Sequence, residues 1–467
     1  MNDTQWTTYF RERQPEHLDE LFAFLRIPSV SALPAHRSDM RLAAEWAAAR
    51  LRSAGVPEVE VLETGGHPLV YGQWQVDINL PTAMVYAHYD VQPPDPLDLW
   101  TTPPFEPVVR DGRIFGRGAG DDKGGLLTTI LAVEAFATLS GGPPINLVFF
   151  FEGEEEIGSP SVTPFVRRER DRLACDFVIS ADGMMWDETT PSLMVSMKGI
   201  AGCEIDLITA ATDMHSGLFG GSVRNSAQAM AELAASFHDR TGRVAVKGFY
   251  DRVVDLTPAD RQEIADVPFD SEAYFGAVGT KPEWGEPGYS PLERLWVRPT
   301  LDINGMWSGF QGDGSKSVTP AESHLKVTCR LVPNQQPDET VELLRAHAER
   351  FTPAGSAMTF RPMAGSALPY AVPRDHPALL AAGQTLRELF DQEPAVVRIG
   401  GSIPIAEVFK SELGAEMILY AWSLPTCNAH APDEWYRVDD FRDGAIATCA
   451  YLEKLAGITL HEAPARG

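Results

Sequence analysis

Short apolar runs alternate with longer helical patterns over the first 180 residues, and this alternation constrains the fold more than any other feature. Residues 83–87, 145–151 and 177–180 have the length and the branched and aromatic side chains of buried strands. Residues 123–139 and 161–171 lie between them and have helical patterns. Strand, helix and strand in this order predict an α/β fold, a mostly parallel sheet flanked by helices.

The pattern changes at about residue 199. Six elements are then expected in the ferredoxin-like order βαββαβ: strand 199–209, helix 225–240, strands 300–307 and 324–331, helix 338–351 and strand 358–362. A proline- and acid-rich insertion, residues 244–297, separates the first of these helices from the second strand. After residue 373 the first pattern returns. We therefore expect an α/β domain, residues 1–198 and 373–467, interrupted by an α+β domain, residues 199–372.

Charge and cysteine usage narrow the possible partners and compartment. The chain of 467 residues has 65 acidic and 39 basic side chains, a net charge of −26. Excess acid repels phosphate backbones and anionic lipid headgroups, so we expect neither nucleic acid nor membrane as a partner. The five cysteines are scattered and show no C-x-x-C spacing, which is typical of buried thiols in a reducing compartment. The first residues lack the pattern of a signal peptide, and we expect a cytoplasmic protein.

Polar residues follow the predicted strands, at the edge where parallel sheets collect their ligands. His88 and Asp90 follow strand 83–87 two positions apart, so both side chains can point the same way. A carboxylate beside a metal-binding histidine fixes the tautomer of the imidazole. Considered by itself, the pair is more typical of a capped strand end than of a functional site.

The glycine-rich segment GRGAGDDKGG, residues 116–125, has the look of a phosphate-binding loop, but two positions exclude this. A dinucleotide fingerprint requires glycine where Asp121 stands, and a Walker loop requires glycine where Asp122 precedes the lysine. Two carboxylates at the start of a helix would repel a phosphate. They favour a divalent cation instead.

Acidic residues also follow the apolar strand 145–151, in the segment FEGEEEIGS. Acidic residues are favoured at the N-terminus of a helix because of the helix dipole, and this accounts for one or two of these acids. A metal ligand next to a general base accounts better for the consecutive Glu154, Glu155 and Glu156. Asp182 and His430, which also follow predicted strands, are ordinary turn or surface residues when considered singly. Considered with the acids and with His88, they predict a metal site at one edge of the sheet.

Six motifs, in this order and spacing, resemble those of the co-catalytic dinuclear zinc peptidase family. They are HYDVQPPDPLDLW with the following PPFEP and GRIFGRGAGDDKGG, then FEGEEEIGS, DMHSGLFGGSV, CRLVPN, GGSIP and NAHAPDEW. Members of this family include cytosolic nonspecific dipeptidase, carnosinase, succinyl-diaminopimelate desuccinylase and the aminoacylases. The resemblance extends from about residue 80 to the end of the chain, and it is strongest to the dipeptidases.

The resemblance implies two divalent ions per subunit, zinc in the first place and manganese or cobalt as alternatives. The implied ligands are His88 and Asp182 for one ion, Glu156 and His430 for the other, and Asp121 as the bridge between them. Asp90 would orient His88. Glu155 would be the general base and acid.

The family's inserted domain supplies a lid and a homodimer interface. By resemblance, His215 would reach the scissile carbonyl of the partner's substrate, and Arg330 would bind the substrate's free carboxylate. Ser317 and Ser402 would make further polar contacts. Alternatively, His215 is a turn histidine with its hydrogen bonds satisfied locally. Arg330, in turn, could be a strand arginine paired with a surface acid.

The expected function is hydrolysis of the amide bond of dipeptides or short peptides that have a free C-terminal carboxylate. An N-acyl amino acid deacylase is the alternative within the hydrolases, because the same metal site removes acyl groups. A metal-dependent peptide-binding protein without catalysis is the alternative of another class, and the base Glu155 argues against it. Ile399 stands before GGSIP, where many dipeptidases of this group have an acid, so recognition of the amino end is expected to be relaxed or shifted.

Overall fold

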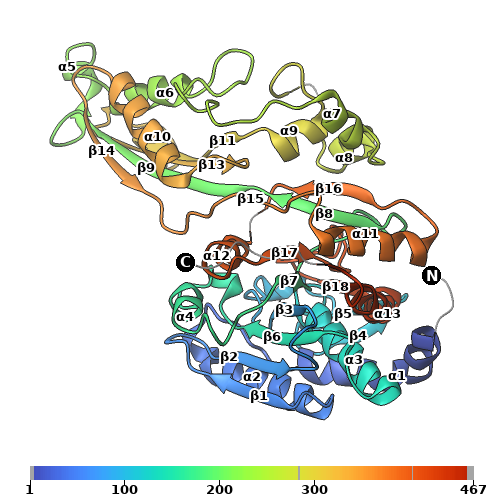
Figure 1. The fold of residues 1–467 in the computed structure, drawn as a ribbon. Coiled ribbons are helices and arrows are strands. Elements are labelled where there is room, and N and C mark those ends of the chain that lie inside the picture. Colours follow the sequence, from blue (N-terminus) through green and yellow to red (C-terminus); the bar gives the residue numbers. More distant parts are fainter. Residues whose placement is uncertain (1–4, 282–283, 402, 460–467) are drawn as a thin grey trace. The chain divides into compact units, whose positions relative to one another are not determined.

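The computed structural model describes residues 5–281, 284–401 and 403–459, which form two compact units (Figure 1). The first, called the α/β unit, comprises Met1–Val195, Val372–Val397 and Ile405–Gly467. The second, called the inserted unit, comprises Ser196–Ala371 and Arg398–Pro404.

The boundaries between the units differ from the predicted ones at Ser196–Lys198 and Val372, and one further segment lies in a different unit from the predicted one. Arg398–Pro404 belongs to the inserted unit rather than to the α/β domain that resumes at residue 373. The backbone N–H of Lys198 donates to the carbonyl of Ile399 at 3.3 Å, and the Arg398 side chain donates to the Glu263 carboxylate at 2.8 Å. These contacts with other parts of the inserted unit explain its placement.

Four parallel strands form the centre of the sheet in the α/β unit. Their order is β6 (Asn146–Glu152), β3 (Thr82–His88), β7 (Phe177–Ser180) and β17 (Glu416–Leu419). Every residue of β6 is buried, as expected for a strand with both faces covered. The parallel strands flanked by helices confirm the predicted fold class.

Antiparallel strands extend this parallel centre at both edges. At one edge β2 (Leu69–Trp74) pairs with β6, and β1 (Glu58–Leu62) pairs with β2. At the other edge β8 (Ser192–Met197) pairs with β17 at Met194. β15 (Tyr370–Ala371) pairs with Ser196 and Met197 of β8, and β16 (Ala395–Ile399) also pairs with β8.

Helices with apolar faces cover the sheet of the α/β unit. The longest are α1 (Gln5–Leu25), α2 (Arg37–Ser53), α3 (Lys123–Ser140), α11 (Pro377–Phe390) and α13 (Val438–Leu455). Helix α13 packs against α1, α3 and α11, and α2 packs against β1 and β2. The first eleven residues of α3, Lys123–Val133, are all buried, which fixes the position of the residues just before its start.

A small three-stranded sheet joins two distant parts of the α/β unit. β5 (Arg113–Phe115) pairs with β4 (Val108–Arg110) and with β18 (Trp435–Arg437). The pairing of β5 with β18 brings the glycine-rich turn that precedes α3 beside the loop that contains His430.

The inserted unit has a four-stranded antiparallel sheet with two main helices. The strand order is β11 (Thr300–Ser308), β13 (Glu322–Leu331), β9 (Gly199–Ile208) and β14 (Ala357–Pro362), and the helices are α6 (Ser226–Ser236) and α10 (Pro337–Phe351). This is the predicted ferredoxin-like arrangement. The predicted insertion contains the short helices α7 (Pro258–Ala265), α8 (Ser271–Ala277) and α9 (Pro291–Val297).

Two further observations concern the chain as a whole. All five cysteines are buried and free, as predicted. Over the described ranges, no helix has the combination of length and apolarity needed to cross a bilayer.

Candidate metal centre

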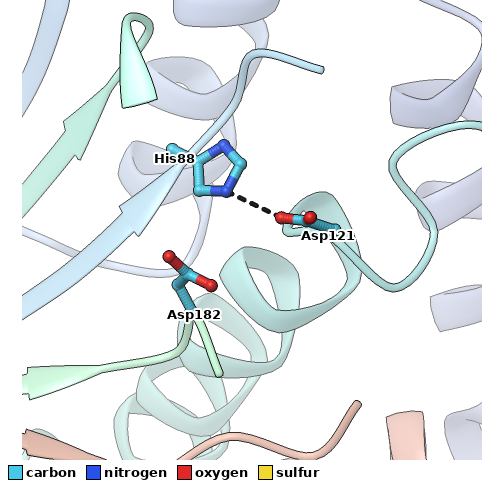
Figure 2. Close-up of side chains that lie close together, drawn as sticks. All are labelled: His88, Asp121 and Asp182. Atoms are coloured by element: carbon cyan, nitrogen blue, oxygen red, sulfur yellow. Dashed lines mark hydrogen bonds and ion pairs between the residues drawn. The ribbon is translucent and has the colours of Figure 1, made fainter. Parts of the chain in front are cut away.

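Three side chains from separate segments of the α/β unit meet at the carboxyl ends of its parallel strands (Figure 2). His88 ends β3, Asp182 follows β7, and Asp121 lies in the turn before α3. One donor atom from each residue lies within 4.8 Å of the other two. Nε2 of His88 is 3.0 Å from Oδ1 of Asp121.

A second group shares Asp121 with the first. Nε2 of His430 lies 3.0 Å from Oδ2 of Asp121 and 3.2 Å from Oε2 of Glu156. The donor atoms of these three residues also lie within 4.8 Å of one another. The two oxygens of Asp121 therefore face different groups, so this carboxylate could contact two ions.

The local backbone explains how His430 comes to this position. His430 has a φ of +61°, a left-handed conformation that is uncommon for residues other than glycine. Asp433, three residues later, accepts from the backbone N–H of Thr101 at 2.8 Å, and Asn428 donates to the Asp433 carbonyl at 3.2 Å. Because 55% of the His430 side chain is exposed whereas His88 is buried, the centre is open to solvent on the His430 side.

Asp90 contacts one residue of each group, His88 and Glu156. Its backbone carbonyl and Oδ1 lie 3.1 Å and 3.3 Å from Nδ1 of His88, so the Nε2 atom of that ring is left for Asp121 or an ion. Oδ2 of Asp90 accepts from the backbone N–H of Glu156 at 3.1 Å. Asp90 is completely buried, and the buried Oδ1 atom has no well-formed hydrogen bond among the described residues.

Acidic side chains crowd this edge of the sheet and change one another's protonation. Burial raises the pKa of Glu155 well above its usual value, and repulsion from Asp182, Glu156 and Asp121 raises it further, against the opposite effect of His88. Burial likewise raises the pKa of Asp182 to about 7, and repulsion from Asp121 adds to the effect. Buried carboxylates that repel one another need positive charge nearby.

The donor set fits divalent metal ions. Imidazole nitrogen and carboxylate oxygen bind zinc at about 2.0–2.2 Å, so donor atoms as close as these can share one ion. Each group combines one histidine with two carboxylates, and the crowded acids gain the positive charge that they lack. The same ligand types also accept manganese and cobalt.

The remaining predicted residues lie in the inserted unit. His215, in β10 (Met214–His215), is exposed, and its Nδ1 accepts from the N–H of Gly217 at 3.0 Å. Ser317 lies beside it, because its carbonyl accepts from the N–H of Ser216 at 3.2 Å. Arg330 is half-buried in β13 and is paired with Thr300 and Ile200 across the sheet. The fourth residue, Ser402, lies outside the described residues.

Three buried acids beside the centre received no individual role from the sequence, although Asp122 was expected, with Asp121, to favour a cation. Asp122 accepts from the backbone N–H of His88 at 3.3 Å, and Glu152 accepts from the hydroxyls of Tyr86 at 2.9 Å and Ser159 at 2.7 Å. Glu434 accepts from backbone N–H groups of the turn before α3. All three stand within the motifs quoted above, which was the signal available.

Comparison with known proteins gives consistent matches along nearly the whole chain. Residues 84–454 match the model of peptidase family M20/M25/M40. The Cys-Gly metallodipeptidase of Schizosaccharomyces pombe is 29% identical over 464 residues, which cover 96% of this chain and 97% of that protein. The crystal structure of human carnosine dipeptidase 1 has a TM-score of 0.82 at 27% identity and covers 97% of this chain and 98% of its own. The structure of an M20 family metallo-carboxypeptidase from Sulfolobus solfataricus has a TM-score of 0.81 at 28% identity, over 95% and 100% of the two chains.

Proposed function

The chain belongs to peptidase family M20/M25/M40 and is a metallopeptidase, and from this premise we propose that it is a two-metal dipeptidase. Its substrates are dipeptides or short peptides with a free C-terminal carboxylate, and the bond hydrolysed is the amide next to that end. The relatives named above include two dipeptidases and a carboxypeptidase, which supports this choice.

The observation that carries the proposal is the position of Asp121 in both donor groups. His88 and Asp182 would hold one ion with it, and Glu156 and His430 would hold the other. When bound, two such ions act as Lewis acids that polarise a carbonyl and lower the pKa of water. We propose zinc for both positions, because tetrahedral histidine and carboxylate ligation is typical of catalytic zinc.

Glu155 is the proposed general base and acid. A carboxyl group whose pKa is raised by burial can accept a proton from the attacking water near neutral pH and return it to the leaving amine. Its neighbour Glu156 lies in the second donor group, so Glu155 is held close to where that water would be. Asp90 acts as a positioning residue, because it fixes the ring of His88.

The inserted unit would supply the substrate contacts. The planar guanidinium of Arg330 matches a carboxylate with two parallel hydrogen bonds, which would confine cleavage to peptides with a free C-terminus. His215 would contact the scissile carbonyl, and Ser317, which lies beside it, would make a further polar contact. Ser402 is proposed for the same role on its position in GGSIP alone.

The inserted unit is also the proposed lid and homodimer interface. β11 is an edge strand of its sheet, and it exposes 41% of Ile303, 53% of Met306 and 41% of Trp307. An exposed apolar edge strand tends to pair with another chain, and a second copy would cover it. The five buried free thiols support a reducing, cytoplasmic location.

A substrate panel with metal analysis tests the proposed function. We expect the purified protein to contain two divalent ions per chain and to hydrolyse free dipeptides faster than N-acetyl or N-succinyl amino acids. Activity on the acylated compounds alone would assign the deacylase function instead. Because Ile399 replaces an acid, dipeptides with a blocked or β-amino end belong in the panel. Peptide binding without any turnover would support the non-catalytic alternative.

A further inference from the structure

The carboxylate of Glu434 is completely buried and receives four hydrogen bonds. Its Oε1 accepts from the backbone N–H groups of Gly120 at 2.9 Å and Asp121 at 3.1 Å. Its Oε2 accepts from the backbone N–H of Gly118 and from Nη1 of Arg117, both at 2.8 Å. The Arg117 side chain is 1% exposed, so the pair is a buried ion pair with all its donors on one turn.

This turn fits closely around the carboxylate because it contains glycine. Gly118 has a φ of +83°, and a Cβ there would lie 2.6 Å from Val91. A Cβ at Gly120 would lie 3.1 Å from the carbonyl oxygen of Trp435, the residue next to Glu434. At Gly120 the backbone of the turn therefore approaches β18 closely, and its N–H group reaches Glu434.

One of these four hydrogen bonds comes from Asp121, the residue that both donor groups share. Asp121 donates its N–H to Glu434, and its side chain presents its two oxygens to His88 and His430. Glu434 also follows His430 by four residues, and its own carbonyl accepts from the N–H of Gly116 at 3.0 Å. One side chain thus ties the turn that carries Asp121 to the loop that carries His430.

We propose that Glu434 is a positioning residue of the metal centre, which holds the backbone of Asp121 so that its carboxylate can serve both ions. This inference rests on the proposed ligation by Asp121. Groups that support metal ligands in this way typically change metal affinity by about 10- to 100-fold when removed. Because Asp121 belongs to both groups, the loss is expected at both positions.

The test is metal affinity of the full-length chain with Glu434→Gln. Each carboxylate oxygen of Glu434 accepts two N–H donors. The NH₂ group of a glutamine, placed at either position, would face two donors, and two hydrogen bonds would be lost. The metal-free protein is titrated with zinc against a chromophoric chelator. We expect both zinc dissociation constants to rise by about 10- to 100-fold. Glu434→Asp, which keeps the charge but shortens the reach, is expected to give an intermediate rise, and it serves as the test if Glu434→Gln does not fold.

Glu293→Gln is the matched control in the inserted unit. Glu293 is also a buried carboxylate that accepts from a backbone N–H, of Ser290 at 2.6 Å, and from an arginine, Arg261 at 2.7 Å. Its replacement is expected to leave both zinc constants unchanged.

Two outcomes are read separately. Glu434→Gln could leave both zinc dissociation constants unchanged and lower the unfolding midpoint equally in metal-free and zinc-loaded protein. This outcome would show a purely structural role and overturn the inference. Asp121→Asn, measured alongside, isolates the ligand proposal. If Asp121→Asn leaves zinc binding unchanged, the ligand set is wrong; if only Glu434→Gln has no effect, the ligand set stands and the positioning role fails.

Discussion

Oδ2 of Asp121 lies 3.0 Å from Nε2 of His430, although the two residues belong to segments far apart in the sequence. The pairing of β5 with β18 produces this approach, because it places the turn before α3 beside the loop before the last helix. The centre is thus completed only when the C-terminal part of the chain folds back onto the N-terminal part.

Asp121→Asn is expected to remove both ions. An amide keeps the size of the side chain but has only one oxygen and no charge, so it cannot bridge two cations. Metal analysis after dialysis should show well under one ion per chain, and dipeptide hydrolysis should fall by at least about 100-fold. Asp98→Asn, at an exposed position in the α/β unit, is the control and should keep both ions. Retention of two ions by Asp121→Asn would contradict the bridging role.

Glu155→Gln is expected to separate metal binding from catalysis. The variant should keep both ions, because the proposed ligands are unchanged, but it should lose the group that transfers the proton. Loss of general acid and base catalysis typically lowers the rate by about 10²- to 10⁴-fold. The measurement is kcat with metal analysis of the same sample. Substantial remaining turnover would assign the base to another residue.

The sequence predicted the parallel centre of the α/β unit and the ferredoxin-like order well, because both arise from local patterns. Strand 177–180 matches β7 residue for residue. Strands β1 and β2 were not predicted, and neither was the exchange of Arg398–Pro404 between units, because these depend on pairing and packing with distant segments.

In the candidate site, too, residues placed by local patterns were predicted, whereas a residue placed by contacts with a distant segment was missed. Each of the proposed metal ligands follows a predicted strand or lies in the glycine-rich turn, and this shared position predicted a metal site. The role of each ligand came from the resemblance. Glu434 was missed because its partners become neighbours only through the β5–β18 pairing. A buried carboxylate that binds backbone N–H groups leaves no trace in local periodicity.

Arg330→Met is expected to weaken recognition of the substrate's C-terminus. A hydrogen-bonded contact to a charged group contributes roughly 1.5–3 kcal/mol, so kcat/KM for free dipeptides should fall by about 10- to 100-fold. The matching C-terminal amides, which lack the carboxylate, should be hydrolysed equally by both proteins. Lys326→Met, four residues earlier in the same strand and 51% exposed, is the control and should leave the preference unchanged. An equal loss on acids and amides would argue for a structural role of Arg330.

Burial of His17 predicts that stability falls in mild acid. His17 is 4% exposed in α1, with ring centroids 5.7 Å from Phe10 and 6.4 Å from Tyr9. Burial, with repulsion from Arg50 and Arg13, lowers its pKa from 6.5 to about 4. The unfolded chain therefore binds a proton at His17 before the folded chain does. Above about pH 6.5, His17 has no effect on the free energy of unfolding. As the pH falls from there towards 4, the folded protein loses stability.

His17→Phe isolates this effect, because it keeps an aromatic ring at the site and removes the ionisable group. In urea unfolding of the metal-free protein with chelator present, the wild type should lose about 2 kcal/mol more than the variant between about pH 7.5 and pH 5. The chelator removes the contribution of metal binding, and the difference between the two curves cancels the titration of all other groups. Parallel stability curves for the two proteins would mean that His17 takes up its proton equally in the folded and unfolded chains, and the proposed cause of acid sensitivity would be wrong.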